Sequence, residues 1–217
     1  TLLIEQREKR KSEFRALQTQ INPHFLYNTL DSIVYLSEQG DSEKVQEMVI
    51  ALSRFFRISI SRGKNIISVK EELEHARNYL LIQQIRYNQK FSFRFDVDPN
   101  TYEYAVVKLI LQPLIENAIY HGINTEVGQG RIEIRSLFED DKLVLEVEND
   151  GYGITQERIE ELYDVIGSPD DSRSVGLKNV FQRIRLYYGD KSNFTISSIL
   201  DENTIIRIEL PVEKVIK

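Results

Sequence analysis

The sequence predicts an α+β protein in which an N-terminal helical hairpin is followed by an α/β sandwich. Three observations support this prediction. Apolar residues recur at helical spacing up to about residue 87, and they alternate with polar residues from residue 91. Beyond that point, segments with the helical period and segments with the strand period follow one another along the chain. We expect a helical domain at residues 1–88 and an α/β domain at residues 89–217, because helices laid on one face of a mixed sheet bury both patterns.

The helical half is predicted to contain three helices. The first is expected over residues 1–39, where Pro23 is the only proline and no glycine occurs. Gly40 ends it, and the Asp-Ser pair that follows can cap the second helix. Residues 68–71 read Ser-Val-Lys-Glu, a capping box that opens a third helix to about residue 87. Helices with short connections form a hairpin or bundle.

Strands and helices alternate from residue 91 onwards. Phe91, Phe93 and Phe95 alternate with polar residues, as in a half-buried strand. Gly122 suits a left-handed C-cap of the helix before it, and Thr155 is the candidate N-cap of the next. The expected elements are strands near residues 91–95, 131–138, 142–148, 194–200 and 204–212, and helices near 106–120, 156–166 and 176–188.

The composition excludes several classes of function. The net charge of −6 argues against broad nucleic-acid binding, which normally needs a basic surface. The absence of cysteine excludes disulfides and thiolate metal sites. Apolar runs are far shorter than the ~20 residues that cross a bilayer, and no signal peptide is visible. Thr1 lies inside a charged helical pattern, so we expect a fragment of a longer protein.

Three polar segments interrupt the apolar pattern of the second half. In the first, Asn117 and His121 are four residues apart, so they project from one helical face, with Glu116 beside them. An amide oxygen such as that of Asn117 is a suitable hard ligand for Mg²⁺. Taken alone, such an amide is more typical of a helix surface.

The other two segments contain glycines. Asn149 and Asp150 precede Gly151 and Gly153, which permit a tight turn and a close approach to a flat ligand. Residues 174–179 enter a helix, where free N–H groups favour an anion. Each pattern alone is also typical of an ordinary turn or helix start. The cofactor-binding candidates are Asn117, His121, Asn149, Asp150, Gly151, Gly153, Gly176, Leu177 and Asn179.

The first predicted helix contains a proline followed directly by a histidine. Pro23 costs a hydrogen bond there, about 3 kcal/mol, which indicates a use for the kink. The next residue, His24, carries an imidazole, and a neutral imidazole is a nucleophile towards phosphorus. A single histidine is more often a solvated helix residue, which is how we interpret His75. Asn28 lies one turn after His24 and could orient its ring. Glu116 could act as a base or orient the imidazole N–H, or it could be an ordinary acidic residue on a helix surface.

Three segments resemble those of a known family. Residues 18–30 read Q-T-Q-I-N-P-H-F-L-Y-N-T-L, residues 111–122 read L-Q-P-L-I-E-N-A-I-Y-H-G, and residues 176–189 read G-L-K-N-V-F-Q-R-I-R-L-Y-Y-G. In this order they closely resemble the LytS/YesM-type sensor histidine kinases. Residues 91–212 resemble the Bergerat-type ATP-binding domain that histidine kinases share with Hsp90-type chaperones, MutL and topoisomerase II.

The resemblance implies roles for these residues. The phosphorylated histidine of the family corresponds to His24, and the asparagine that holds Mg²⁺ against the phosphates of ATP corresponds to Asn117. Gly151 and Gly153 would cradle adenine, and residues 154–175 would form a lid. We expect a homodimer formed through the N-terminal helices, a response regulator receiver domain as partner and no nucleic acid. The chain would be the cytoplasmic portion of a bacterial membrane sensor, attached only through a preceding segment.

Two positions depart from the family pattern and leave alternatives open. Asn149 stands where the family usually has the aspartate that accepts the adenine amine, and Ser174 replaces the first glycine of the last motif. A basic residue is also common where Tyr120 stands. Besides a kinase, the sequence is therefore compatible with an ATP-binding signalling scaffold of weak or no kinase activity. A related serine kinase or chaperone-like ATPase would lack the segment around His24.

Overall fold

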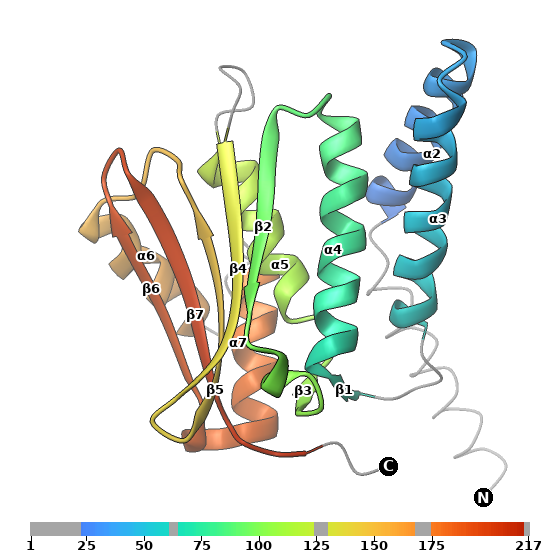
Figure 1. Cartoon of the computed structure of the whole chain (residues 1–217). Helices are drawn as coiled ribbons and strands as arrows, with labels where there is room; N and C mark the ends of the chain where they lie inside the picture. The colour runs from blue at the N-terminus through green and yellow to red at the C-terminus, as the bar shows by residue number, and fades with distance from the viewer. Residues whose placement is uncertain (1–22, 61–64, 124–129, 168–174, 215–217) are drawn as a thin grey trace, which may run out of the picture.

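The computed structural model describes residues 23–60, 65–123, 130–167 and 175–214. It contains the helices α2 (Pro23–Glu38), α3 (Ser42–Ser59), α4 (Val69–Arg86), α5 (Leu111–Asn117), α6 (Gln156–Gly167) and α7 (Val175–Tyr188). The strands are β1 (Ile66–Ser68), β2 (Phe91–Val97), β3 (Ala105–Val107), β4 (Gly130–Glu139), β5 (Lys142–Asn149), β6 (Asn193–Ile199) and β7 (Asn203–Pro211). The predicted α+β class is confirmed (Figure 1).

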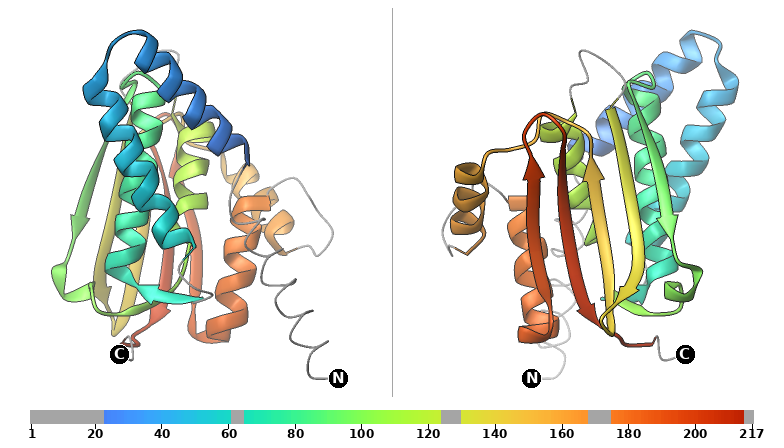
Figure 2. Two further views of the ribbon diagram at one scale, coloured as in Figure 1. Left: turned by 90° about the vertical axis from the view of Figure 1, so that its right-hand side faces the viewer. Right: turned by 60° about the vertical axis from the view of Figure 1, so that its left-hand side comes forward.

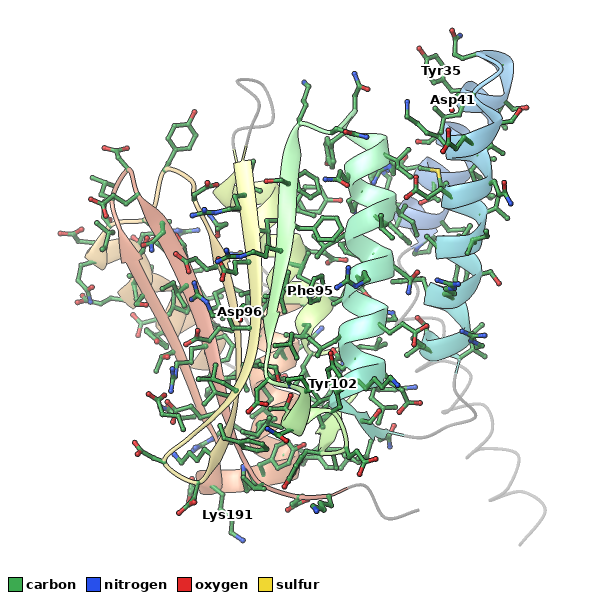
Figure 3. The ribbon with its side chains drawn as sticks, in the orientation of Figure 1. Tyr35, Asp41, Phe95, Asp96, Tyr102 and Lys191 are labelled. Atoms are coloured by element: carbon green, nitrogen blue, oxygen red, sulfur yellow. The ribbon has the colours of Figure 1, made fainter. Side chains whose placement is uncertain are left out.

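Five strands form one mixed sheet in the order β2-β4-β5-β7-β6. β2 runs parallel to β4, and the other pairs are antiparallel. Helices cover one face of this sheet, whereas the other face is open, as the right-hand view of Figure 2 shows. Figure 3 shows Phe95 and Asp96 on opposite sides of β2, and the guanidinium of Arg77 on α4 lies 4.4 Å from the Phe95 ring. The sheet therefore buries one face against α4, α5, α6 and α7.

The helix ends follow the predicted caps. Gly40 has φ +73° after α2, and the Asp41 side chain accepts a hydrogen bond from the Lys44 backbone N–H at the start of α3. Ser68 and Glu71 form the complete capping box that opens α4. The Thr155 hydroxyl accepts a hydrogen bond from the Arg158 N–H at the start of α6. These predictions are confirmed.

The helix predicted over residues 106–120 is wrong in its details. Residues 105–107 form strand β3, which pairs with β1, and α5 begins only at Leu111. The segment Ala118–Gly122 is a π-helical turn. Gly122 does not adopt the left-handed conformation of a C-cap glycine, because the positive-φ glycines of the described chain are Gly40, Gly153 and Gly189. Strands of three residues are too short for a clear alternation of apolar and polar residues.

Helix α4 lies between the hairpin of α2 and α3 and the sheet domain (Figure 1). Phe25 of α2 packs on Phe55 of α3 and on Tyr79 of α4, each with ring centroids 5.1 Å apart. One apolar core runs from Phe25 through α4 to Ile208 in β7. The domain boundary expected at residues 88/89 falls in the turn between α4 and β2, and packing continues across it. None of the described helices is long and apolar enough to span a membrane.

Candidate functional site

A pocket of ≈ 290 Å³ lies where α5, the turn after it, β5, α6 and β7 meet. Its lining combines amide, imidazole, guanidinium and hydroxyl groups with two aliphatic side chains. The lining residues are Asn117, His121, Gly122, Asn149, Ile154, Arg158, Leu162 and Thr204. The predicted binding residues Asn117, His121 and Asn149, which come from two separate segments, therefore meet in one pocket.

Backbone geometry places the polar side chains. Asn117 is the last residue of α5, and His121 follows within the π-helical turn. Such turns inside a helix are frequent at functional sites. Asn149 ends β5, where it is paired with Ile132 of β4 and Thr204 of β7. Because Asn149 and Thr204 are neighbours across the ladder, both reach the same end of the pocket.

The glycines of the site pack in close contact. A Cβ on Gly122 would lie 2.2–2.7 Å from the side-chain amide of Asn149, and a Cβ on Gly151 would lie 1.5 Å from the Gly122 carbonyl oxygen. Gly153 has φ +64°, and a Cβ there would lie 2.3 Å from the Ile199 carbonyl oxygen. Gly151 and Gly153 therefore have no room for a Cβ because backbone atoms face them, whereas at Gly122 the Asn149 side chain would have to move.

Asn149 differs from its neighbour Asp150 in what it contacts. The Asn149 side chain is 3% exposed, and its Nδ2 is a buried donor without a hydrogen-bond partner. A buried unpaired donor costs free energy, so this amide fits a ligand that brings an acceptor into the pocket. The Asp150 carboxylate accepts a hydrogen bond from the Arg131 backbone N–H instead, and does not line the pocket.

The third predicted segment is described only in part. Gly176, Leu177 and Asn179 lie in the first turns of α7, which packs against α5. Leu177 is buried and Asn179 is exposed, and these residues do not line the pocket in the described part of the chain. Of the region expected to form a lid, residues 156–167 form helix α6, whereas Ser174 and residues 168–173 lie outside the described residues.

Four further side chains line the pocket, those of Ile154, Arg158, Leu162 and Thr204. The first three lie within the segment expected to form a lid, but sequence reasoning singled out none of the four. Arg158 is the permanently charged side chain among the described lining residues, and it also pairs with Glu161 at 2.7 Å. Its charge lies within a run of mixed charges on α6, which reads as a solvated helix face. Thr204 could have been found only from the strand register.

His24 is exposed on α2, one turn before Asn28. The Asn28 amide nitrogen lies 3.1 Å from His24 Nε2 and 3.3 Å from Nδ1, so the two side chains are in contact as their spacing predicts. The next residue, Phe25, is buried against Phe55 and Tyr79. The exposed imidazole therefore lies directly before an anchored residue.

Glu116 lies beside the pocket but does not line it. Its carboxylate accepts a hydrogen bond from Gln112 at 2.9 Å. Burial raises the pKa of the Glu116 carboxyl, while hydrogen bonds from Gln112 and Tyr79 act in the opposite direction. The side chain is thus largely enclosed rather than on a helix surface.

His75 is not on a solvated helix face, contrary to the sequence prediction. It is fully buried, stacks on Phe55 with ring centroids 4.3 Å apart, and pairs through Nε2 with the Ser59 hydroxyl at 2.9 Å. Burial and then the positive charge of Lys108 lower the pKa of His75 to about 3. The polar residues beside His75 in the sequence suggested an exposed position. The ring is buried because α4 packs against other elements on both sides.

The described residues contain no cluster of three or more His, Cys, Asp or Glu side chains that could hold a metal by themselves. In proteins, Mg²⁺ commonly takes one or two protein ligands together with phosphates and water. Asn117 offers the pocket an amide oxygen of the required type.

Two family models match the chain. Residues 12–91 match the model described as histidine kinase, and residues 104–214 match that of the histidine kinase-, DNA gyrase B-, and HSP90-like ATPases. Among solved structures, the catalytic domain of histidine kinase ThkA superposes with a TM-score of 0.51 at 22% identity, over 67% of this chain and 93% of that domain. A mycobacterial sensor histidine kinase, MprB, gives 0.52 at 17% identity, over 69% and 98%. These two likenesses show the fold.

Curated relatives align over nearly the whole chain. Sensor histidine kinase YesM of Bacillus subtilis is 33% identical over 202 residues, which is 93% of this chain and 34% of YesM. Sensor protein LytS of Staphylococcus saprophyticus is 31% identical over 87% of this chain and 32% of LytS. YwpD of Bacillus subtilis is 35% identical over 90% of this chain and 69% of YwpD. The chain spans about a third of the length of YesM and LytS. It belongs to the LytS/YesM-type sensor histidine kinases.

Proposed function

We propose that this chain is the kinase core of a two-component sensor, which autophosphorylates His24 from Mg²⁺-ATP and transfers the phosphoryl group to an aspartate of a response regulator. The observation that supports this best is the contrast between two sites. An exposed imidazole lies on the hairpin, and a polar pocket with an unpaired buried donor lies in the sheet domain. A phosphotransfer kinase needs both sites, one for the acceptor and one for the nucleotide.

The nucleotide would lie across the pocket. The Asn149 amide and the Thr204 hydroxyl would contact the edge of adenine. Gly122, which lines the pocket, would lie beside the ring, while Gly151 and Gly153 would shape the turn through their packing on the Gly122 and Ile199 backbone. Asn117 would hold Mg²⁺, which when bound neutralises phosphate charge and orients the leaving group. Arg158 adds a positive charge on the α6 side, which offsets the lack of a basic side chain at Tyr120. His121 and the start of α7, with Gly176, would complete the site.

The transfer itself needs a positioned nucleophile more than covalent help from the protein. A neutral ring nitrogen of His24 would attack the γ-phosphorus, forming an N–P bond while the bond from phosphorus to the bridging oxygen of ADP breaks. The proton on the other ring nitrogen then leaves to a base or to solvent. Asn28 is the candidate for orienting the ring because its amide touches it. Glu116 remains the candidate base.

The hairpin also carries an exposed apolar face. The large exposed apolar side chains of α2 recur at helical spacing, and α3 adds two more. They are Tyr27, Leu30, Val34 and Tyr35 on α2, and Val49 and Ile50 on α3. An exposed apolar stripe such as that of α2 fits the helices of a second copy. We propose that the chain dimerises through residues 1–88 and binds ATP through residues 89–217, on the cytoplasmic side of a membrane-attached sensor.

One assay tests the proposal. The chain is incubated with Mg²⁺ and ATP labelled at the γ-phosphate, beside His24→Ala and, as a control on the same helix, Ser37→Ala. We expect acid-labile label on the wild-type chain and on Ser37→Ala, and none on His24→Ala. Acid-stable label would contradict the histidine assignment. ATP binding without any label would favour the signalling scaffold, and a purified receiver domain that removes the label would support transfer to an aspartate.

A further inference from the structure

Glu72 on α4 is fully buried, and its carboxylate binds the backbone just ahead of α5. Oε2 accepts a hydrogen bond from Leu109 N–H at 2.7 Å, and Oε1 accepts from Ile110 and Leu111 N–H, each at 2.8 Å. Leu111 is the first residue of α5 and Ile110 its N-cap, so their N–H groups have no partner within the helix. No side chain from the local sequence caps α5. A carboxylate from another helix therefore provides the N-terminal cap.

The same turn is held from its other side by α7. Arg183 donates hydrogen bonds to the carbonyl oxygens of Lys108 at 2.9 Å and Leu109 at 3.4 Å. Leu109 has φ +59°, a conformation that costs a non-glycine residue free energy and persists only where the surroundings enforce it. Glu72 and Arg183 thus clamp the turn at residues 108–111 between two helices, one through its N–H groups and one through its C=O groups.

The clamp lies at the start of α5, the helix that carries the pocket residue Asn117. This helix has only 7 residues, and it ends at Asn117. Asn117 lies six residues after Leu111, about 9 Å along the axis at 1.5 Å per residue. A small tilt at the first turn therefore displaces the Asn117 amide oxygen from the pocket.

On its other side α4 packs against the hairpin. His75, one turn after Glu72, pairs with the Ser59 hydroxyl at the end of α3. Lys108 in the clamped turn reaches the Ser59 carbonyl oxygen at 3.4 Å. The clamp therefore lies between α3, the second helix of the hairpin, and α5, the helix that carries Asn117.

We propose that Glu72 is a positioning residue, whose carboxylate holds the first turn of α5 so that Asn117 reaches the Mg²⁺-ATP. Because α4 also packs against the hairpin, Glu72 connects the position of Asn117 to that of the hairpin. This inference rests on the proposed function. Both carboxylate oxygens are needed as acceptors for the three N–H groups. Glutamine has the same shape, but it would turn an NH₂ donor towards at least one of them.

The test compares Glu72→Gln with the wild-type chain and with Glu74→Gln. Glu74 is on the same helix, and its half-exposed carboxylate lies 3.6 Å from Arg57. The dissociation constant for ATP is measured by calorimetry with Mg²⁺ and with EDTA, well below each protein's melting temperature. Mg²⁺ should tighten ATP binding by a certain factor in the wild-type chain, and we expect this factor to be about tenfold smaller in Glu72→Gln. The dissociation constant measured in EDTA should be the same for both proteins. Glu74→Gln should keep both the factor and the constant of the wild-type chain.

A purely structural role would lower only the melting temperature, because the molecules that remain folded would bind Mg²⁺-ATP normally. An undiminished Mg²⁺-dependent gain in Glu72→Gln therefore overturns the inference alone. If Glu72→Gln does not fold, Arg183→Lys replaces it, since lysine keeps the charge but loses the planar fork. The same selective loss is then expected, and a full gain overturns the inference. A wild-type chain that binds no ATP would overturn the proposed function and this inference together.

Discussion

The Cα of Gly151 packs directly against the backbone of Gly122, so closely that a Cβ on Gly151 would lie 1.5 Å from the Gly122 carbonyl oxygen. The two glycines come from different predicted segments, and their contact joins the turn after α5 to the turn after β5. The Asn149 side chain lies against the same Gly122. One wall of the pocket is therefore made of backbone.

This contact predicts a large effect of one methyl group. Gly151→Ala must push two backbones apart, so we expect a loss of unfolding free energy of at least about 1–3 kcal/mol, the usual cost of overpacking. Urea denaturation measures it. Gly167→Ala is the control, because Gly167 has nothing within 4 Å of its would-be Cβ and ends a helix. It should be neutral or stabilising by up to about 1 kcal/mol. Equal stability of Gly151→Ala and wild type would contradict the packing.

Asn149→Asp tests the adenine position. The variant replaces a buried amide by a buried carboxylate, so the nucleotide-free protein should become less stable. An adenine amine would then donate to a charged acceptor, and we expect tighter ATP binding by about 1 kcal/mol, roughly fivefold. Calorimetry measures the dissociation constant. The control is Asp150→Asn, which should leave the constant unchanged, because Asp150 faces the Arg131 backbone. An unchanged constant in Asn149→Asp would point to a shifted register.

Asn117→Ala should weaken binding of Mg²⁺-ATP by about tenfold or more, roughly 1.4 kcal/mol, by removing the amide ligand. Binding of ATP in EDTA should hardly change, since the amide would contact the metal rather than the base. Asn193→Ala, at the exposed start of β6, serves as the control. If affinity falls equally with and without Mg²⁺, Asn117 contacts the nucleotide itself and the metal assignment is wrong.

The burial of His75 predicts a pH dependence of stability. The pKa of His75 is about 3 in the folded chain against 6.5 for an ordinary histidine, so between these values the unfolded chain binds a proton that the folded chain does not. The unfolding free energy should therefore fall as pH falls through this window, by up to about 1.4 kcal/mol per pH unit from this group. Above pH 6.5 the contribution is constant.

The comparison that isolates this effect is between wild type and His75→Gln, each unfolded in urea at several pH values from 7 to 4. The wild-type chain should lose more stability than the variant over this range. His121→Gln is the control, because His121 is exposed in the pocket lining. Parallel pH profiles for wild type and His75→Gln would show that the buried ring titrates normally.

Val34→Lys should weaken the proposed dimer. Val34 is 57% exposed in the middle of the apolar face of α2, and a lysine there would place a charge in the seam between two copies. Sedimentation velocity measures the dimer dissociation constant, which should rise about tenfold or more for a charge buried at an interface. Ser197→Lys, exposed on β6, should leave it unaffected. A dimer that tolerates Val34→Lys uses another surface.

Local signals in the sequence predicted much of the fold. Capping residues such as Asp41 and Ser68 act within three or four residues of themselves, so the starts of α3 and α4 could be predicted from the sequence. The strands that became β4 and β5 were also predicted, and Asp140 and Asp141 between them adopt the positive φ values of a tight hairpin turn. The polar segments around Asn117 and Asn149 do meet in one pocket.

Long-range contacts could not be predicted in this way. Glu72 caps a helix start 37 to 39 residues further along the chain, and nothing near α5 indicates a missing cap. His75 was misjudged because a helix packed on both sides carries no simple apolar stripe. Arg158 reaches the pocket through the placement of α6 against the sheet, which depends on tertiary packing rather than on local pattern.

The apolar core that passes without a break from Phe25 to Ile208 bears on how the chain loses its structure. Helix α4 packs with one side against the hairpin and with the other against the sheet domain. Unfolding of either part would therefore expose buried side chains of α4, Tyr79 and Leu80 among them. Denaturation should then be one cooperative event. A destabilising substitution at the buried Met48 of the hairpin would therefore abolish nucleotide binding at high temperature, because the sheet domain would unfold together with the hairpin.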